Sequence, residues 1–118
     1  MTINETPRGI IEISPNAIAT LASHAALQTY GVVGMAAPNL ASDIASSLTR
    51  DPNRGIVVRQ EGNHIVVDVY VIVEYGTRIA SVANSLINAV RYTVEQSIGV
   101  PVGQVNVHVQ GLRVSRTE

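Results

Sequence analysis

I-V-V-D-V-Y-V-I-V-E-Y-G, from Ile65 to Gly76, is the stretch of sequence that decides the fold. Its residues divide into two alternating sets, which are Ile65, Val67, Val69, Val71, Val73 and Tyr75 on one side and Val66, Asp68, Tyr70, Ile72 and Glu74 on the other. Alternation with β-branched residues on one side is typical of a strand with one face on a core and the other partly covered. We expect this to be the central strand.

Two neighbouring segments fit beside it. Val105 to Gln110 repeats the alternation, which predicts an adjacent strand with valines inward and amides and an imidazole outward. Gly62-Asn63 is a two-residue connection of the kind that closes a tight hairpin between Ile56 to Glu61 and His64 to Tyr75. In that register Glu61 faces His64, Arg59 faces Val66 and Val57 faces Asp68, so that Arg59 and Asp68 lie within reach of each other.

The remaining segments supply helices and short strands. Gly9 to Ile13 is short, apolar and mostly β-branched, so it predicts a first strand. Ser14-Pro15 then predicts the start of a helix that ends at Gly31. Val32 to Met35 suggests an edge strand, and Arg78 to Ile98 has the apolar spacing of a second long helix, stopped by Gly99 and Pro101. Leu40, Ile44 and Leu48, spaced four apart, predict a short helix that Asn39 could cap, before a turn at Asp51-Pro52-Asn53.

The order strand, helix, three strands, helix, strand predicts an α+β fold. We expect one two-layer domain over residues 9–114, with both long helices on one face of a small mixed or antiparallel sheet. Residues 1–8 are polar and interrupted by proline, which predicts a mobile lead-in, and residues 115–118 form a short tail.

Composition bounds the function. At 118 residues and 46% hydrophobic, the chain is long enough for one core and too short for two independent domains. Its eight basic residues, all arginine, are scattered among nine acids, which predicts no footprint for nucleic acid or for an anionic bilayer. No cysteine is present, and neither a signal peptide nor a membrane span is evident in the sequence. We expect a soluble, cytoplasmic protein that meets a membrane only through a partner.

Several segments together resemble the alkaline shock protein 23 family of envelope stress response proteins. They are G-I-I-E-I-S at Gly9 to Ser14, Y-G-V-V-G-M at Tyr30 to Met35, V-E-Y-G at Val73 to Gly76 with the helix after it, and V-N-V-H-V-Q-G at Val105 to Gly111. The resemblance covers Gly9 to Val114. This chain departs from the usual pattern in having no lysine, and in having Ala80-Ser81 where a Pro-Glu pair is common.

The resemblance implies a bacterial cytoplasmic protein of cell-envelope homeostasis. Such proteins are held to self-associate and to act near the membrane through a membrane-anchored partner, with no established catalytic residues. We expect no cofactor. The expected function is therefore a non-enzymatic scaffold or adaptor in the envelope stress response. A small regulatory module that binds a soluble enzyme or nucleic acid is the alternative.

Other chemistries have weaker support in the residues. Asp68, Glu74 and His108 could share an open sheet face, where a carboxylate beside an imidazole begins acid–base work, but no nucleophile elbow or phosphate loop accompanies them. His24, His64 and His108 have none of the short spacings of a metal site. Tyr70 alone could stack a base, with Asp68 and Glu74 nearby to repel phosphate. We therefore expect no enzyme activity, no metal, and no nucleic-acid partner.

The open sheet face is better interpreted as an interaction surface. An apolar centre with a polar rim has the anatomy of a protein interface, and Tyr70→Glu should then alter the oligomeric state. The alternative is that the last strand or the helix at Leu40 to Leu48 covers this face within the monomer. The expected interface residues are Val57, Arg59, Val66, Asp68, Tyr70, Ile72, Glu74, Asn106, His108 and Gln110.

Overall fold

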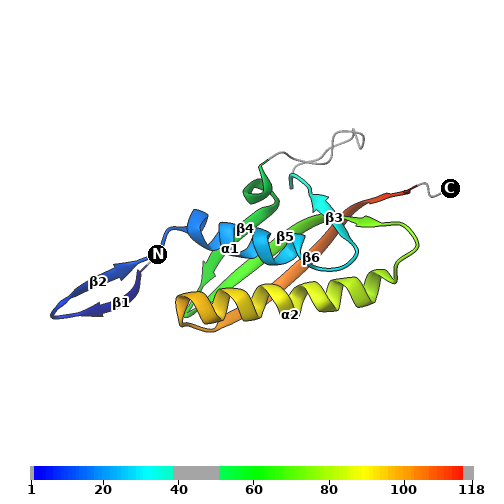
Figure 1. The fold of residues 1–118 in the computed structure, drawn as a ribbon. Coiled ribbons are helices and arrows are strands. Elements are labelled where there is room, and N and C mark those ends of the chain that lie inside the picture. The colour runs from blue at the N-terminus through cyan, green and yellow to red at the C-terminus, as the bar shows by residue number, and fades with distance from the viewer. Residues whose placement is uncertain (1, 39–50, 116–118) are drawn as a thin grey trace.

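A computed structural model, which describes residues 2–38 and 51–115, shows a two-layer α+β domain with a hairpin standing apart from it (Figure 1). The elements follow the order β1 (Thr2–Thr6), β2 (Gly9–Glu12), α1 (Pro15–Leu27), β3 (Val32–Met35), η2 (Pro52–Gly55), β4 (Ile56–Glu61), β5 (His64–Glu74), α2 (Ile79–Ile98) and β6 (Val102–Arg113). The expected order of strands and helices is confirmed, with β1 added at its start.

The central strand of the sheet is β5, as the alternation of its sequence predicts. Along one edge it pairs antiparallel with β4 and then with β3, and along the other edge it pairs parallel with β6 over almost its whole length. The β4–β5 register matches the expectation at every pair named, including Arg59 opposite Val66 and Val57 opposite Asp68. Because β3 and β4 share one edge of β5, this mixed sheet of four strands is only three strands wide.

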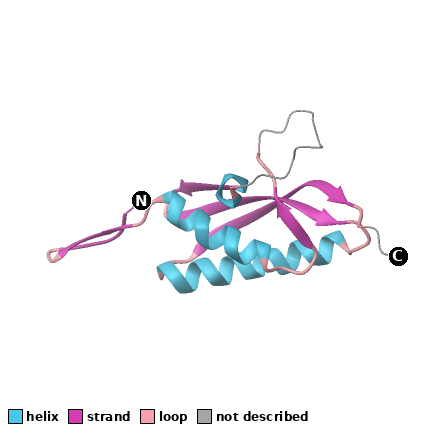
Figure 2. Ribbon diagram, turned by 45° about the horizontal axis from the view of Figure 1, so that its top comes forward, coloured by secondary structure: helices cyan, strands magenta, loops and turns pink. Residues whose placement is uncertain are grey.

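Both helices lie on the same face of this sheet (Figure 2). The valines of the inward face of β5 are completely or almost completely buried there, and Leu86, Val90 and Val94 of α2 pack on them together with the small residues Ala22 and Ala26 of α1. Small side chains on α1 let the two helices approach each other and the sheet. Burial of this β-branched layer is the main source of the domain's stability.

The helix ends follow local sequence signals, with one difference from expectation. Ser14 caps α1 by accepting from the amide of Ala17, and Gly99, at φ 81°, ends α2 in the left-handed conformation that glycine adopts readily. However, α1 ends at Leu27 rather than at Gly31, because the amides of Gln28 and Thr29 turn back to the carbonyls of Ala25 and Ala26. Gly31 lies in the turn that leads into β3 instead.

The turn expected at Asp51-Pro52-Asn53 is present as η2, which is fixed to α1 by side chains. The Asp51 carboxylate accepts from the Asn53 amide, and the Asn53 side chain bonds with the hydroxyls of Thr20 and Ser23. Ser23, which is buried, thereby has a partner. The expected helix at Leu40 to Leu48 lies outside the described residues.

The N-terminal segment differs most from the sequence interpretation. Residues 2–6, within the expected lead-in, form β1, and the first strand at Gly9–Glu12 pairs with β1 rather than with the main sheet. This β1–β2 hairpin points away from the domain (Figure 1) and leaves Ile10 and Ile11 exposed. Alternation alone could not indicate which strand β2 would pair with.

Candidate functional site: the open face of the sheet

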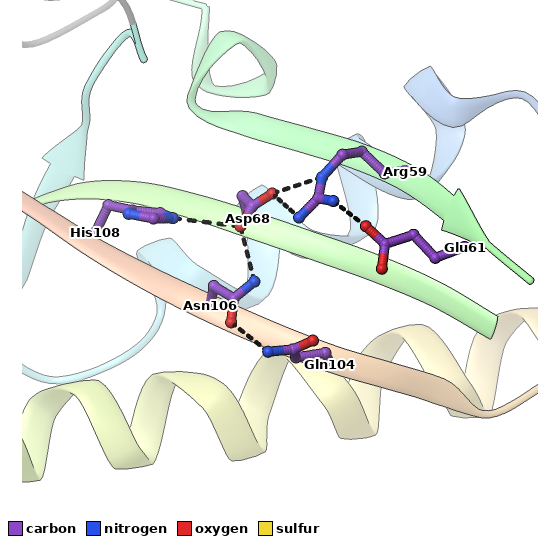
Figure 3. Close-up of polar contacts among 6 residues, drawn as sticks. All are labelled: Arg59, Glu61, Asp68, Gln104, Asn106 and His108. Atoms are coloured by element: carbon purple, nitrogen blue, oxygen red, sulfur yellow. Dashed lines mark hydrogen bonds and ion pairs between the residues drawn. The ribbon is translucent and has the colours of Figure 1, made fainter.

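The face of the sheet opposite the helices carries a connected group of polar side chains centred on Asp68 (Figure 3). Asp68 projects from the middle of β5, with Val57 of β4 directly opposite on one side and Asn106 of β6 on the other. Only 7% of Asp68 is exposed, so its carboxylate needs partners that replace water. Its neighbours on β4 and β6 provide them.

Both carboxylate oxygens of Asp68 accept hydrogen bonds. Oδ2 accepts from Nε and Nη2 of Arg59 at 3.1 and 2.9 Å. Oδ1 accepts from the Asn106 amide at 2.9 Å and lies 3.2 Å from Nε2 of His108. A carboxylate that contacts a guanidinium group on one side and an amide and an imidazole on the other is held in one orientation.

These contacts set the charge state of Asp68. Burial raises the pKa of the Asp68 carboxyl, but the hydrogen bonds from Asn106, Arg59 and His108 more than offset burial and bring the pKa below its usual value. The contact with Asp68 in turn raises the pKa of Arg59. Asp68 is therefore ionised at neutral pH. A carboxylate whose two oxygens already accept several hydrogen bonds is a poor general base.

The group also contains Glu61 and Gln104, which are not among the expected interface residues. Arg59 also forms an ion pair with Glu61 on the same strand, and Gln104 donates to the side chain of Asn106 at 3.1 Å (Figure 3). Each lies two residues from a partner on its own strand and so shares its face. This spacing of two residues can be seen in the sequence and could have identified both residues.

Tyr70 forms the aromatic part of the face. Its ring stacks on the His108 imidazole, with ring centroids 4.4 Å apart and planes inclined by 12°. Tyr70 and His108 are paired directly across β5 and β6, and both are partly exposed. The imidazole is thus held by the tyrosine ring on its face and by Asp68 at its edge.

The ten expected interface residues do not contribute equally to the surface. Val66 and Ile72 are only 1% and 4% exposed, so these two aliphatic residues lie beneath the surface rather than on it. Val57, Tyr70, Asn106, His108 and Gln110 are partly exposed, and Arg59 is exposed. Gln110 falls at an irregularity of the β5–β6 register, between the pairs that Val109 and Gly111 make with β5. The accessible surface is therefore mainly polar, with Tyr70 as its aromatic centre.

Glu74 lies apart from the Asp68 group. It is six residues further along the same strand, which corresponds to roughly 20 Å, and it contacts Arg113 and the backbone amide of Ser115. Asp68 and Glu74 consequently cannot act on one substrate atom as a pair of carboxylates. Of the three residues considered for acid–base chemistry, Asp68, Glu74 and His108, only Asp68 and His108 are in contact.

Two further observations concern binding of ions and membranes. Within the described residues, no group of three or more His, Asp or Glu side chains is placed to hold a metal ion. His24, His64 and His108 lie on α1, at the start of β5 and on β6. Among these same residues, no helix combines the length and the apolar character needed to span a bilayer.

The sequence of this chain matches known proteins along nearly its whole length. The model of the alkaline shock protein 23 family, which is described as having a cell envelope-related function, matches residues 3–114. The uncharacterized protein YloU of Bacillus subtilis (strain 168) is 47% identical over an alignment of 112 residues, and the match covers 93% of each chain. The uncharacterized protein Spy1614 of Streptococcus pyogenes serotype M6 is 37% identical and covers 97% of each chain.

Among solved structures, a variant of MamM CTD is similar to this chain in fold. The TM-score is 0.52 at 16% sequence identity, and the match covers 91% of this chain and 99% of that one. At this level of identity the likeness concerns the fold alone.

Proposed function

The chain belongs to the alkaline shock protein 23 family, which has a cell envelope-related function, and we propose that it serves this function as a non-enzymatic, self-associating scaffold. In this proposal it works in the envelope stress response, in the cytoplasm close to the membrane, and a membrane-anchored protein is its partner. The sequence resemblance to envelope stress response proteins supports the stress role. The surface chemistry of the chain supports a protein partner.

The observation that carries the proposal is the ordered open face of the sheet. Tyr70 and Arg59, two residue types that often anchor protein interfaces, are held in fixed positions by His108 and Asp68. Side chains already held in place lose little conformational entropy when a partner binds. The buried Val66 and Ile72 support this layer from below.

A protein partner fits the charge of the chain better than lipid does. The net charge is −1, and the open face mixes Arg59 with Glu61, Asp68 and Glu74 instead of gathering basic residues. Attraction to an anionic bilayer needs clustered Lys and Arg, each adding about 1 kcal/mol near the surface. Mixed charges around an aromatic centre instead suit a protein surface of complementary pattern.

The test is an affinity pull-down from the protein's own cells, with detergent-solubilised membranes and the soluble fraction treated in parallel. Tyr70→Glu should lose a membrane-spanning partner that the wild type retains. Tyr92→Glu is the matched control, because Tyr92 is exposed on α2, on the other layer of the domain. Thermal unfolding of both variants would show that each is folded.

Two outcomes would contradict the proposal. Recovery of only a soluble enzyme or nucleic acid would favour the alternative of a regulatory module. Equal recovery of the membrane protein by Tyr70→Glu and wild type would remove the open face from the binding surface.

A further inference from the structure

The outer edge of β6 is a long strand edge without the charged residues and proline that usually protect one. Within the part of the chain that the structure describes, β6 pairs only with β5, so its other edge meets no strand. Natural proteins protect such edges with lysine, proline, inward-pointing charges, β-bulges or very short strands, and of these devices β6 has only the two register irregularities that flank its middle. From Val102 to Leu112 this strand contains no Lys, Arg, Asp, Glu or Pro, and β6 spans 12 residues.

The sequence of this edge is nearly symmetric about Val107. Read outward from that residue in V-G-Q-V-N-V-H-V-Q-G-L, the pairs are Asn106 with His108, Val105 with Val109, Gln104 with Gln110, Gly103 with Gly111, and Val102 with Leu112. Three of these five pairs are identical, one joins two aliphatic residues, and one joins two polar residues that bind Asp68. An edge with this symmetry presents the same residues in both directions.

We propose that β6 pairs antiparallel with β6 of a second copy, about a two-fold axis at Val107. Two-fold interfaces bring the same patch of each subunit together, so a self-complementary strand is what such an axis requires. The two four-stranded sheets would join into one continuous sheet with the helices of both copies on the same face. The proposal rests on the self-association included in the proposed function and names the edge that performs it.

Side-chain placement is consistent with this register on both faces. On the helix side, Val105 would lie opposite Val109 of the second copy, and Val109 is 37% exposed in the single chain. On the open side, Asn106 would lie opposite His108 of the second copy, so amide and imidazole meet across the axis. The two groups centred on Asp68 would then form one polar row across the dimer (Figure 3 shows the row of one copy).

The ends of β6 limit the pairing to its middle. The amide of Val102 donates to Glu95 and its carbonyl accepts from Arg91, so side chains of α2 already satisfy the backbone of this residue. The β5–β6 register shifts near Gly103 and again at Gln110, which interrupts the regular strand on both sides of Val107. The regular pairing would therefore run from about Gln104 to about Gln110 of each copy.

Cysteine cross-linking tests the register directly, because the chain contains no cysteine. Opposed residues of antiparallel strands have Cα atoms about 4.5 or 5.5 Å apart, and both distances suit a disulfide. Val107→Cys should therefore form a covalent dimer under mild oxidation. Gln104→Cys is the matched control, because its counterpart would lie six residues away, roughly 20 Å. Cross-linking of both variants would indicate a parallel pairing and overturn the proposal.

A second variant tests the edge without cross-linking. Val109→Lys places a charge at the seam, so its mass by light scattering should fall from twice the 12.5 kDa of one chain to a single chain. Tyr92→Lys, exposed on α2, should remain dimeric. A far-UV circular dichroism spectrum like that of the wild type would show that the Val109→Lys variant is folded. A wild type that stays monomeric at high concentration would overturn the proposal.

The two proposals can fail separately. If Val107→Cys does not cross-link but Tyr70→Glu loses the membrane partner, the edge pairing is wrong and the proposed function stands. If Val107→Cys cross-links and Tyr70→Glu still recovers the partner, the edge pairing stands and the open face is not the partner surface.

Discussion

The two faces of β5 are buried by different means, although they belong to one strand. On the helix side, α1 and α2 cover Val67, Val69, Val71 and Val73, and close packing of apolar side chains excludes water. On the open side, Asp68 is nearly as buried, although the helices lie on the opposite face, and Arg59, Asn106 and His108 surround it. The first face stabilises the fold, whereas the contacts on the second face hold exposed side chains in fixed positions.

Adding a carboxylate at the next residue of β5, which lies on the packed face, would break this comparison most severely. Val69→Asp would place a charge among buried aliphatic side chains, where none of the donors that serve Asp68 can reach it. The cost should be several kcal/mol, because an unpaired buried charge loses its hydration without compensation. We expect loss of the cooperative unfolding transition by circular dichroism. A folded Val69→Asp protein would show that this face is wetter than its burial indicates.

Truncating Leu86, on α2, tests the packed face more gently. Leu86 is fully buried in the core, so Leu86→Ala should lower the free energy of unfolding by about 3 kcal/mol through lost burial and the remaining cavity. Urea unfolding measures this value. Ile79→Ala is a control on the same helix, since Ile79 is 42% exposed and should cost much less. Equal losses would contradict the assignment of Leu86 to the core.

Removing Asp68 tests the polar face. Asp68→Ala leaves Arg59 and His108 with partly exposed donors that water can satisfy, so the free energy of unfolding should fall by about 2 kcal/mol, less than for Leu86→Ala. The His108–Tyr70 stack should also loosen, which NMR of the imidazole would detect. An unchanged imidazole signal would mean that Asp68 does not orient the ring.

The two faces should also respond differently to acid. The pKa of Asp68 is lowered in the folded protein, so the unfolded state takes up its proton first as pH falls. Stability from this group is present above the ordinary carboxyl pKa of about 3.9 and is lost as pH falls through the lower folded value. Asp68→Asn should flatten the slope of stability against pH in this window. A slope equal to that of the wild type would assign it to other carboxylates.

The smallest effect is expected at the rim of the open face. The Arg59–Glu61 ion pair lies between two largely solvated side chains. Exposed pairs contribute little, because water and salt screen them and because side-chain order opposes them. Glu61→Gln should therefore leave the urea midpoint unchanged, while Arg59 keeps its contacts with Asp68. A clear shift in midpoint would mean that the Arg59–Glu61 ion pair contributes to stability.

The packed face was predictable from sequence, and the polar face only in part. Period-two alternation identified β5, and Gly62-Asn63 set the β4–β5 register, so the Arg59–Asp68 contact followed from counting residues. The β5–β6 register was not predictable, because α2 separates the strands and no short turn fixes their alignment. The contacts of Asp68 with Asn106 and His108 depend on that register.

The N-terminus shows a second limit of sequence reasoning. The composition of Gly9 to Ile13 predicts a strand, which the structure has at Gly9–Glu12, but pairing partners depend on tertiary contacts that a short apolar run does not encode. The signal that could have identified β1 is the alternation of polar β-branched residues at Thr2 and Thr6, which is weak. The same ambiguity applies to where α1 ends, since both Gln28 and Gly31 can terminate a helix.

The contrast between the two edges of β5 has a consequence for the order of folding events. The β4–β5 hairpin closes through two residues, whereas β6 can join β5 only after α2 crosses between them. Short loops close in microseconds or less, and distant pairings must first meet a larger entropy cost. We therefore expect the hairpin to form before the folding barrier and the parallel β5–β6 ladder to complete after it. In stopped-flow kinetics, substitutions in the ladder would then accelerate unfolding, and those at the hairpin turn would slow refolding.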